Sequence, residues 1–170
     1  MDNTMDNPQV TLTELAWLAG IWDGEGTFGI NRLKRKNEKS YAYHGRLTLS
    51  NTSEEMICEI ERIFGLLGVK AHFWREKTSR KPTHKKAVHI TLNKQDHVRY
   101  VCEKIQPYIV AKKERVSILL EYVISRQQYK KIAIRGEKGR ILGVKTQGYS
   151  KKEISLYEQM KSLNQVGISV

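Results

Sequence analysis

Two acidic side chains, Asp23 and Glu25, alternate with glycines at the end of an apolar run in residues 18–27. The stretch before them, residues 11–22, has the apolar spacing of a helix, and the two glycines end it. Because the C-terminus of a helix carries a partial negative charge, carboxylates placed there are unfavourable unless a cation compensates them. The pattern therefore indicates a metal site or, more simply, a helix that ends in solvated acids.

The same helix carries small residues at Ala16, Gly20 and Gly24, four positions apart and therefore on one face. Such spacing lets the backbones of two helices approach closely. At the other end of this helix, Thr11 and Glu14 have the spacing of a capping box. The sequence thus predicts a well-defined helix with one face suited to close packing against another helix.

The string at residues 18–27 resembles the signature motif of the LAGLIDADG homing endonucleases. Five residues match it at identity, namely Leu18, Ala19, Gly20, Asp23 and Gly26. Glu25 stands where the family carries its metal-binding acid. The resemblance extends from about Leu12 to Val116, with a weaker match in the C-terminal helix.

Composition narrows the classes of partner. Thirty Lys and Arg against eighteen Asp and Glu give a net charge of +12, which favours nucleic acid first and an acidic membrane surface second. No apolar run is long enough to span a bilayer, and residues 1–10 read as a polar, disordered lead rather than a signal or transit peptide. Residues 11–170 are expected to form one domain of an intracellular, non-secreted protein, whose compartment stays open.

The remaining ionisable and thiol side chains point away from other site classes. Cys58 and Cys102 lack the paired spacing of a zinc finger, and both are expected to be reduced core residues. The histidines also lack the spacing of zinc ligands.

The order of predicted elements is α-ββ-α-ββ-α-α, followed by a loop and a last helix, an α+β fold class. The helices are expected over 11–22, 52–67, 93–106, 112–128 and 150–163, the strands over 27–34, 41–50, 69–77 and 87–93, and the loop over 129–148. The family resemblance implies that the four strands form an antiparallel, saddle-shaped sheet backed by helices.

The two strand pairs carry basic tips, and the second strand alternates apolar and polar residues. A two-stranded ribbon fits the major groove of DNA, where base edges can be distinguished; alternatively, the charged tips are simply solvated. The orientation of the first strand and the role of Trp74, stacking or packing, stay open, since an outward Asn31 would also turn Leu33 outward. The candidate DNA-binding residues are Asn31, Arg32, Lys34, His44, Arg46, Thr48, Ser50, Arg75, Lys77, His89 and Thr91.

The acidic motif occurs once in the chain. Cutting both strands of a duplex needs two hydrolytic centres or one that repositions, and a twofold dimer is the economical solution. The helix face of Ala16, Gly20 and Gly24 would form the contact, with Asp23 also at the interface. The two Glu25 carboxylates would then meet near the twofold axis, where divalent ions neutralise them.

The resemblance also implies a set of catalytic residues. Glu25 would bind Mg²⁺, with Mn²⁺ as a substitute, and the Gly24 carbonyl would be a second ligand. Lys112, which follows an apolar-x-Pro-aromatic-apolar stretch, would lie near the leaving group, with Lys113 as the nearest competitor. Ser53 would orient solvent, unless it caps a helix instead.

Taken together, these features predict an intron-encoded type of site-specific homing endonuclease. It would cut double-stranded DNA at a long pseudo-palindromic site by metal-dependent phosphodiester hydrolysis. Two alternatives remain: a non-cleaving binder on the same scaffold, such as an RNA splicing maturase or a repressor, and a basic RNA-associated protein in which the motif is coincidental.

Overall fold

The structure is a computed structural model that describes residues 9–34, 41–78, 83, 85–128, 132–135, 140–145 and 148–165, with only the backbone for 132–135 and 141–145. Its elements in chain order are α1 (Leu12–Gly24), β1 (Thr27–Lys34), β2 (Tyr41–Asn51), α2 (Glu54–Leu66), β3 (His72–Arg75), β4 (Val88–Leu92), α3 (Gln95–Ile105), a 3₁₀ turn η1 (Gln106–Tyr108), α4 (Lys113–Gln128), β5 (Ile132–Arg135), β6 (Ile141–Lys145) and α5 (Lys151–Gln165).

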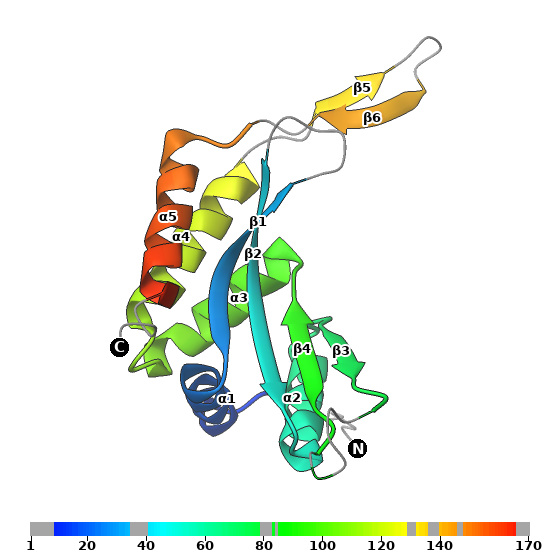
Figure 1. Cartoon of the computed structure of the whole chain (residues 1–170), viewed down its shortest axis with the longest axis vertical. Coiled ribbons are helices and arrows are strands. Elements are labelled where there is room, and N and C mark those ends of the chain that lie inside the picture. The colour runs from blue at the N-terminus through cyan, green and yellow to red at the C-terminus, as the bar shows by residue number, and fades with distance from the viewer. Residues whose placement is uncertain are drawn as a thin grey trace, which may run out of the picture.

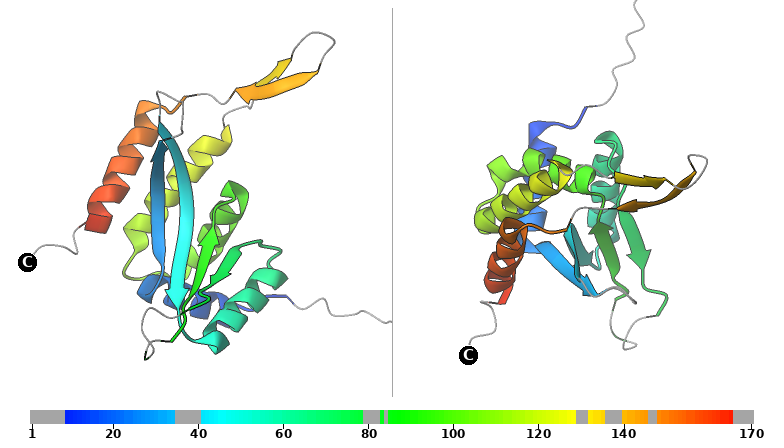
Figure 2. Two further views of the ribbon diagram at one scale, coloured as in Figure 1. Left: turned by 45° about the vertical axis from the view of Figure 1, so that its right-hand side comes forward. Right: turned by 90° about the horizontal axis from the view of Figure 1, so that it is seen from above.

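Four strands form one antiparallel sheet in the order β1-β2-β4-β3, so the two hairpins lie side by side with β2 against β4. Helices α1 to α4 lie behind this sheet in Figure 1, and in the view from above in Figure 2 no described helix or strand covers the opposite face. The α-ββ-α-ββ-α-α order predicted from the sequence is confirmed. The described elements therefore leave one face of the sheet open.

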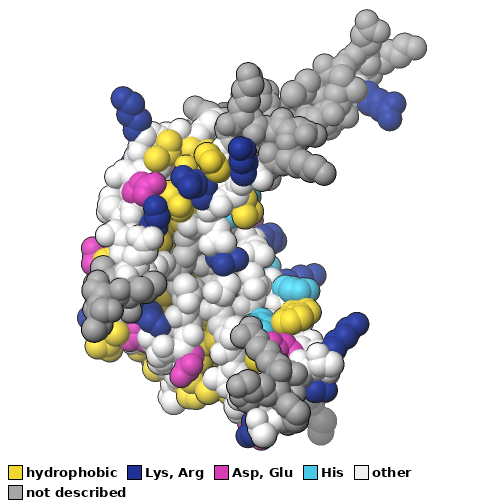
Figure 3. All heavy atoms as spheres, viewed as in Figure 1, with side chains coloured by type: hydrophobic (Ala, Val, Ile, Leu, Met, Phe, Trp, Pro, Cys, Tyr) yellow, Lys and Arg dark blue, Asp and Glu magenta, His cyan; other side chains and the backbone are white. Residues whose placement is uncertain are grey.

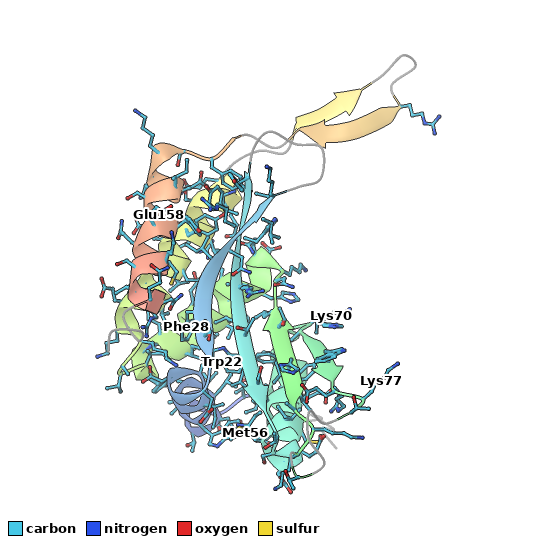
Figure 4. All side chains as sticks on the ribbon, viewed as in Figure 1. Trp22, Phe28, Met56, Lys70, Lys77 and Glu158 are labelled. Atoms are coloured by element: carbon cyan, nitrogen blue, oxygen red, sulfur yellow. The ribbon has the colours of Figure 1, made fainter. Side chains whose placement is uncertain are left out.

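The core lies between the sheet and the helices. Trp22 of α1 and Phe28 of β1 are fully buried there, and their side chains point inward in Figure 4. Gly45 lets α4 approach β2 closely, because a Cβ at this position would lie 2.9 Å from Leu119 and 3.0 Å from Val123. This close packing holds the sheet at a fixed distance from α4.

The predicted helix starts are mostly confirmed. Thr11 and Glu14 form a complete capping box, and Ser150 and Glu153 form a reciprocal pair at the start of α5. Helix α3 begins later than the expected range of 93–106, at Gln95, and its N-cap Lys94 gives no side-chain cap.

Two expectations were wrong. Residues 129–148 were expected to form an irregular loop, but β5 and β6 pair in a separate two-stranded sheet that projects beyond the ends of β1 and β2 (Figure 1). Each strand carries two β-branched residues, which favour strand structure, but the glycines and basic residues around them had favoured a loop. Cys58 is exposed on α2 rather than buried, whereas Cys102 is a core residue as expected.

Other expectations fall partly outside the described residues. These include residues 1–8 of the expected lead, the 35–40 loop and most of the 78–86 loop. Val10, at the end of that lead, packs against the core. In the described part of the chain, none of the helices has the length and apolar character needed to cross a bilayer.

Candidate active site at the end of helix α1

Gly26 ends the motif by packing directly on the side chain of Trp22. A Cβ at position 26 would lie 2.8 Å from the Trp22 Cγ and 2.9 Å from its Cα, closer than real contacts allow. The Trp22 indole is fully buried and packs against Phe64 with ring centroids 5.7 Å apart. Glycine at position 26 thus lets the chain turn from α1 into β1 across a core aromatic ring.

We expect Gly26→Ala to destabilise the protein by about 1–3 kcal/mol, because the added methyl group must displace a buried indole. Thermal or denaturant unfolding measures this. The matched control is Gly65→Ala in α2, where a Cβ would meet nothing within 4 Å. A Gly26→Ala variant as stable as this control would contradict the packing argument.

Asp23 binds the beginning of α4. Its Oδ2 accepts hydrogen bonds from the backbone N–H groups of Val110 (2.9 Å) and Ala111 (2.8 Å), and its Oδ1 accepts from Lys112 N–H (2.8 Å). A carboxylate at a helix N-terminus satisfies free N–H groups and complements the helix dipole. Although partial burial raises the pKa of Asp23, these hydrogen bonds outweigh it and hold the pKa below its usual value. The structure thus gives Asp23 partners within its own chain.

Lys112 makes the reverse contact, from the start of α4 to the end of α1. Its Nζ donates to the carbonyl oxygens of Gly26 (2.7 Å), Gly24 (3.1 Å) and Trp22 (3.3 Å). A lysine is poorly placed at the start of its own helix, but here its ammonium group compensates the C-terminal dipole of α1. Partial burial lowers the pKa of Lys112, against the opposing effect of Asp23.

Glu25 differs from Asp23 because its side chain stays exposed. It is the C-cap residue of α1 and its carboxylate makes no hydrogen bond or ion pair with any described residue. Among those residues, no three His, Cys, Asp or Glu side chains gather into a metal-binding cluster. Among the described residues of the motif, Glu25 is thus the acid whose carboxylate is exposed and without a hydrogen-bond partner.

One side of α1 has no covering element in the described chain. Gly20 and Gly24 are exposed, and a Cβ at either would meet nothing within 4 Å; Ala16 on the same face is partly exposed. Three apolar side chains are exposed near this face: Leu12 (71%) and Trp17 (36%) on α1, and Val110 (77%) next to Asp23. None of these three residues was among the interface candidates chosen from the sequence.

The open face of the sheet brings together most of the predicted DNA-binding residues. The pairing register places Asn31 opposite His44 and Thr48 opposite Thr91, with His89 opposite Ser50. These side chains are exposed or half-buried, whereas their neighbours Leu47, Leu49 and Ile90 are buried. Figure 3 shows Lys and Arg side chains spread along this side of the molecule. Arg46 shares the face through its pairing with Gly29.

Three of the predicted residues lie on the opposite face. Arg32 pairs with Tyr43 in the register and its guanidinium lies 4.5 Å from the Tyr41 ring centroid, while Lys34 pairs with Tyr41 itself. Arg75 lies 3.7 Å from the Glu61 carboxylate of α2. The alternation of a strand therefore separates these side chains from the open face. Lys77 follows β3 and projects from its end (Figure 4).

Ser53 occupies the N-cap of α2. Its Oγ accepts a hydrogen bond from Met56 N–H (3.3 Å) and donates to Glu55 (2.9 Å). The sequence left two roles for Ser53, orienting solvent or capping a helix. The structure shows the capping contact.

His72 on the open face was missed, and the role of Trp74 had stayed open. His72 and Trp74 of β3 pair with Thr91 and His89, which puts both on the same face as those residues. Alternating exposure in such a short edge strand is hard to predict from sequence, because a one-residue shift reverses the two faces.

A family model for a LAGLIDADG-like domain matches residues 13–106, more than half of the 170-residue chain. The chain belongs to the LAGLIDADG family. The matched region runs from α1 to the end of α3, so Lys112 and the backbone groups that bind Asp23 lie just beyond it. The curated proteins contain no significant match to the sequence.

Solved structures of LAGLIDADG homing endonucleases share the fold. The archaeal intron-encoded I-Vdi141I, complexed with DNA, aligns with a TM-score of 0.59 and 13% identity over 88% of this chain and 83% of its own. I-CvuI, complexed with the I-CreI target in the presence of Mg, aligns at 0.57 and 17% over 92% and 81%. The group I intron-encoded I-CeuI, complexed with DNA, aligns at 0.53 and 17% over 70% and 57%.

Proposed function

We propose that this LAGLIDADG protein is a site-specific homing endonuclease that acts as a homodimer and hydrolyses both strands of a long, pseudo-palindromic DNA site with Mg²⁺. The observation that carries the proposal is the exposed Glu25 carboxylate at the end of α1, beside an uncovered glycine face. The similar structures of I-Vdi141I, I-CvuI and I-CeuI are DNA complexes, which supports DNA as the substrate.

The homodimer follows from the number of available carboxylates and from the surface around them. Each chain contributes one free acid, Glu25, because Asp23 is bound to the start of α4. Packing α1 against its symmetry mate would cover Gly20 and Gly24 and bury the apolar Trp17 and Val110. It would also bring two Glu25 side chains together, so that each cut strand meets one acid.

An exposed carboxylate beside a backbone carbonyl oxygen fits Mg²⁺, which binds through one or two carboxylates, phosphate oxygens and water. When bound, the ion polarises the phosphate and lowers the pKa of a bound water. Glu25 would hold the ion, and the Gly24 carbonyl has a second lone pair beside its hydrogen bond from Lys112. Lys112 would hold its positive charge close to the leaving oxygen.

The open face of the sheet would read the DNA. Asn31, His44, Arg46, Thr48 and Thr91 line this face with hydrogen-bonding groups at the two-residue period of the strands. Such donors and acceptors suit the major groove, and the net charge of +12 favours the approach of a polyanion.

A selection from a randomised duplex library tests the proposal. Duplexes bound without divalent ion are recovered and sequenced, and the enriched site is then incubated with the protein and Mg²⁺. We expect a long, approximately twofold-symmetric site and cleavage of both strands within it. Specific binding without scission at any Mg²⁺ concentration would favour the non-cleaving binder on the same scaffold, and binding without a preferred site would contradict both.

We expect Gly20→Leu to convert the dimer into monomers without unfolding them. In the single chain a Cβ at position 20 meets nothing within 4 Å, and leucine raises helix propensity by about 0.8 kcal/mol relative to glycine. In the dimer it would force the two helix backbones apart. Sedimentation velocity measures the change, with Gly65→Leu in α2 as the matched control. A Gly20→Leu protein that still sediments as a dimer would place the interface elsewhere.

A further inference from the structure

The open face of the sheet contains an exposed indole that the proposed hydrogen-bonding contacts do not use. Trp74 lies on the edge strand β3 and is 51% exposed. Its register partner across the strands is His89, which places the indole on the same face as Thr91 and Ser50. Figure 3 shows histidine and hydrophobic side chains together on the β3–β4 side of this face. A large apolar side chain is thus presented among polar ones.

One side of the indole packs against a second ring. Its ring lies 4.9 Å from the His89 ring, with an interplanar angle of 32°. His89 is fixed on both sides, because Nδ1 lies 2.7 Å from Ser50 Oγ and Nε2 lies 3.4 Å from a Glu76 carboxylate oxygen. The other oxygen of Glu76 accepts a hydrogen bond from Ala87 N–H at 3.1 Å, which connects the chain of contacts to the hairpin backbone.

We propose that Trp74, positioned by His89, is a specificity-determining residue that reads thymine methyl groups in the major groove. The inference rests on the proposed function and specifies how one part of the same surface selects its substrate. At the base edges of the major groove, the C5-methyl of thymine is the apolar group available for contact. An indole on a hydrogen-bonding face therefore distinguishes thymine from the other bases, whereas its neighbours read donors and acceptors.

The geometry disfavours a purely structural role for the indole. Core aromatic residues such as Trp22 are fully buried, while half of the Trp74 surface remains exposed after it packs on His89. An aromatic ring with few rotatable bonds also loses little conformational entropy when it contacts a ligand. The second exposed apolar residue on this face, Leu33 (52%), lies on the opposite edge strand and so contacts a different part of the site.

The test compares the sites bound by the wild-type protein and by Trp74→Ala in the library selection. We expect the variant to lose the preference for thymine at one or two positions in each half-site and to keep the preferences elsewhere. Replacing thymine by uracil at those positions removes only the methyl group. This should weaken wild-type binding by about fourfold per methyl, the worth of burying one such group. Trp74→Ala should be insensitive to the exchange, and Trp74→Phe should retain most of the preference.

Tyr100→Ala, an exposed aromatic on α3 behind the sheet, is the matched control and should leave the site unchanged. Wild-type binding that is equal for thymine and uracil at every position would overturn the inference. So would a Trp74→Ala variant that keeps the wild-type response to uracil. These outcomes differ from failure of the proposed function, in which the wild-type protein selects no site at all.

Discussion

Replacing Glu25 with glutamine is expected to slow cleavage of the selected site by about a thousandfold or more, while Kd for the site changes by less than about threefold. Glutamine keeps the shape of the side chain but removes the negative charge that would hold Mg²⁺. Binding should persist because Glu25 lies at the end of α1 and contributes nothing to the open face of the sheet. Single-turnover cleavage and equilibrium binding, measured on one duplex, separate the two effects.

Glu158→Gln provides the control for this experiment. Glu158 is an exposed glutamate on α5, shown on the outer side of that helix in Figure 4, and it lies 3.9 Å from Lys161 in a surface ion pair of little energetic weight. Its replacement should leave both cleavage and binding unchanged. If Glu25→Gln cuts at the wild-type rate, Glu25 does not bind the metal and the proposed active site is wrong.

Asp23→Asn is expected to destabilise the protein by about 2 kcal/mol at neutral pH, since it removes the charge from a carboxylate that binds three backbone N–H groups at a helix N-terminus. For a chain of this size, the midpoint of thermal unfolding should fall by roughly 4–8 °C. Asp96→Asn is the matched control, because Asp96 is an exposed aspartate in the first turn of α3. Its replacement should lower the free energy of unfolding by much less.

The Asp23 effect should depend on pH with a defined sign. The pKa of Asp23 is lower in the folded chain than its ordinary value of 3.8. Its stabilisation is therefore fully present above the unfolded pKa and is lost as the pH falls through the folded one. The difference in unfolding free energy between wild type and Asp23→Asn should thus shrink below about pH 4. A difference that stays constant to pH 2 would show that the charge is not what matters.

Local patterns predicted the elements that carry strong local signals. The capping box at Thr11, the alternation along β2 and the apolar spacing of α2 and α4 placed these elements close to their observed bounds. Each of these signals comes from residues within the element itself, so it does not depend on how distant segments pair. The same holds for Glu25, whose exposure follows from its place at the end of an apolar helix.

The features that depend on pairing between distant segments could not be predicted. The orientation of β1 was undecided from the sequence, because an outward Asn31 also turns Leu33 outward. The register with β2 shows that Asn31, and not its neighbour Arg32, shares the open face with His44. Arg75 faces α2 for the same reason. The partners of Asp23 lie almost ninety residues away, which no local pattern reveals.

The exchange of charged side chains between the ends of α1 and α4 has a consequence for chain synthesis. The contacts of Asp23 and Lys112 close a loop of about 88 residues, so neither can form before the second of the two has left the ribosome. Until then the acids of the motif face an uncompensated helix dipole, and the end of α1 is prone to fray. A nascent chain that stops short of residue 112 therefore holds the motif without the geometry that makes it useful.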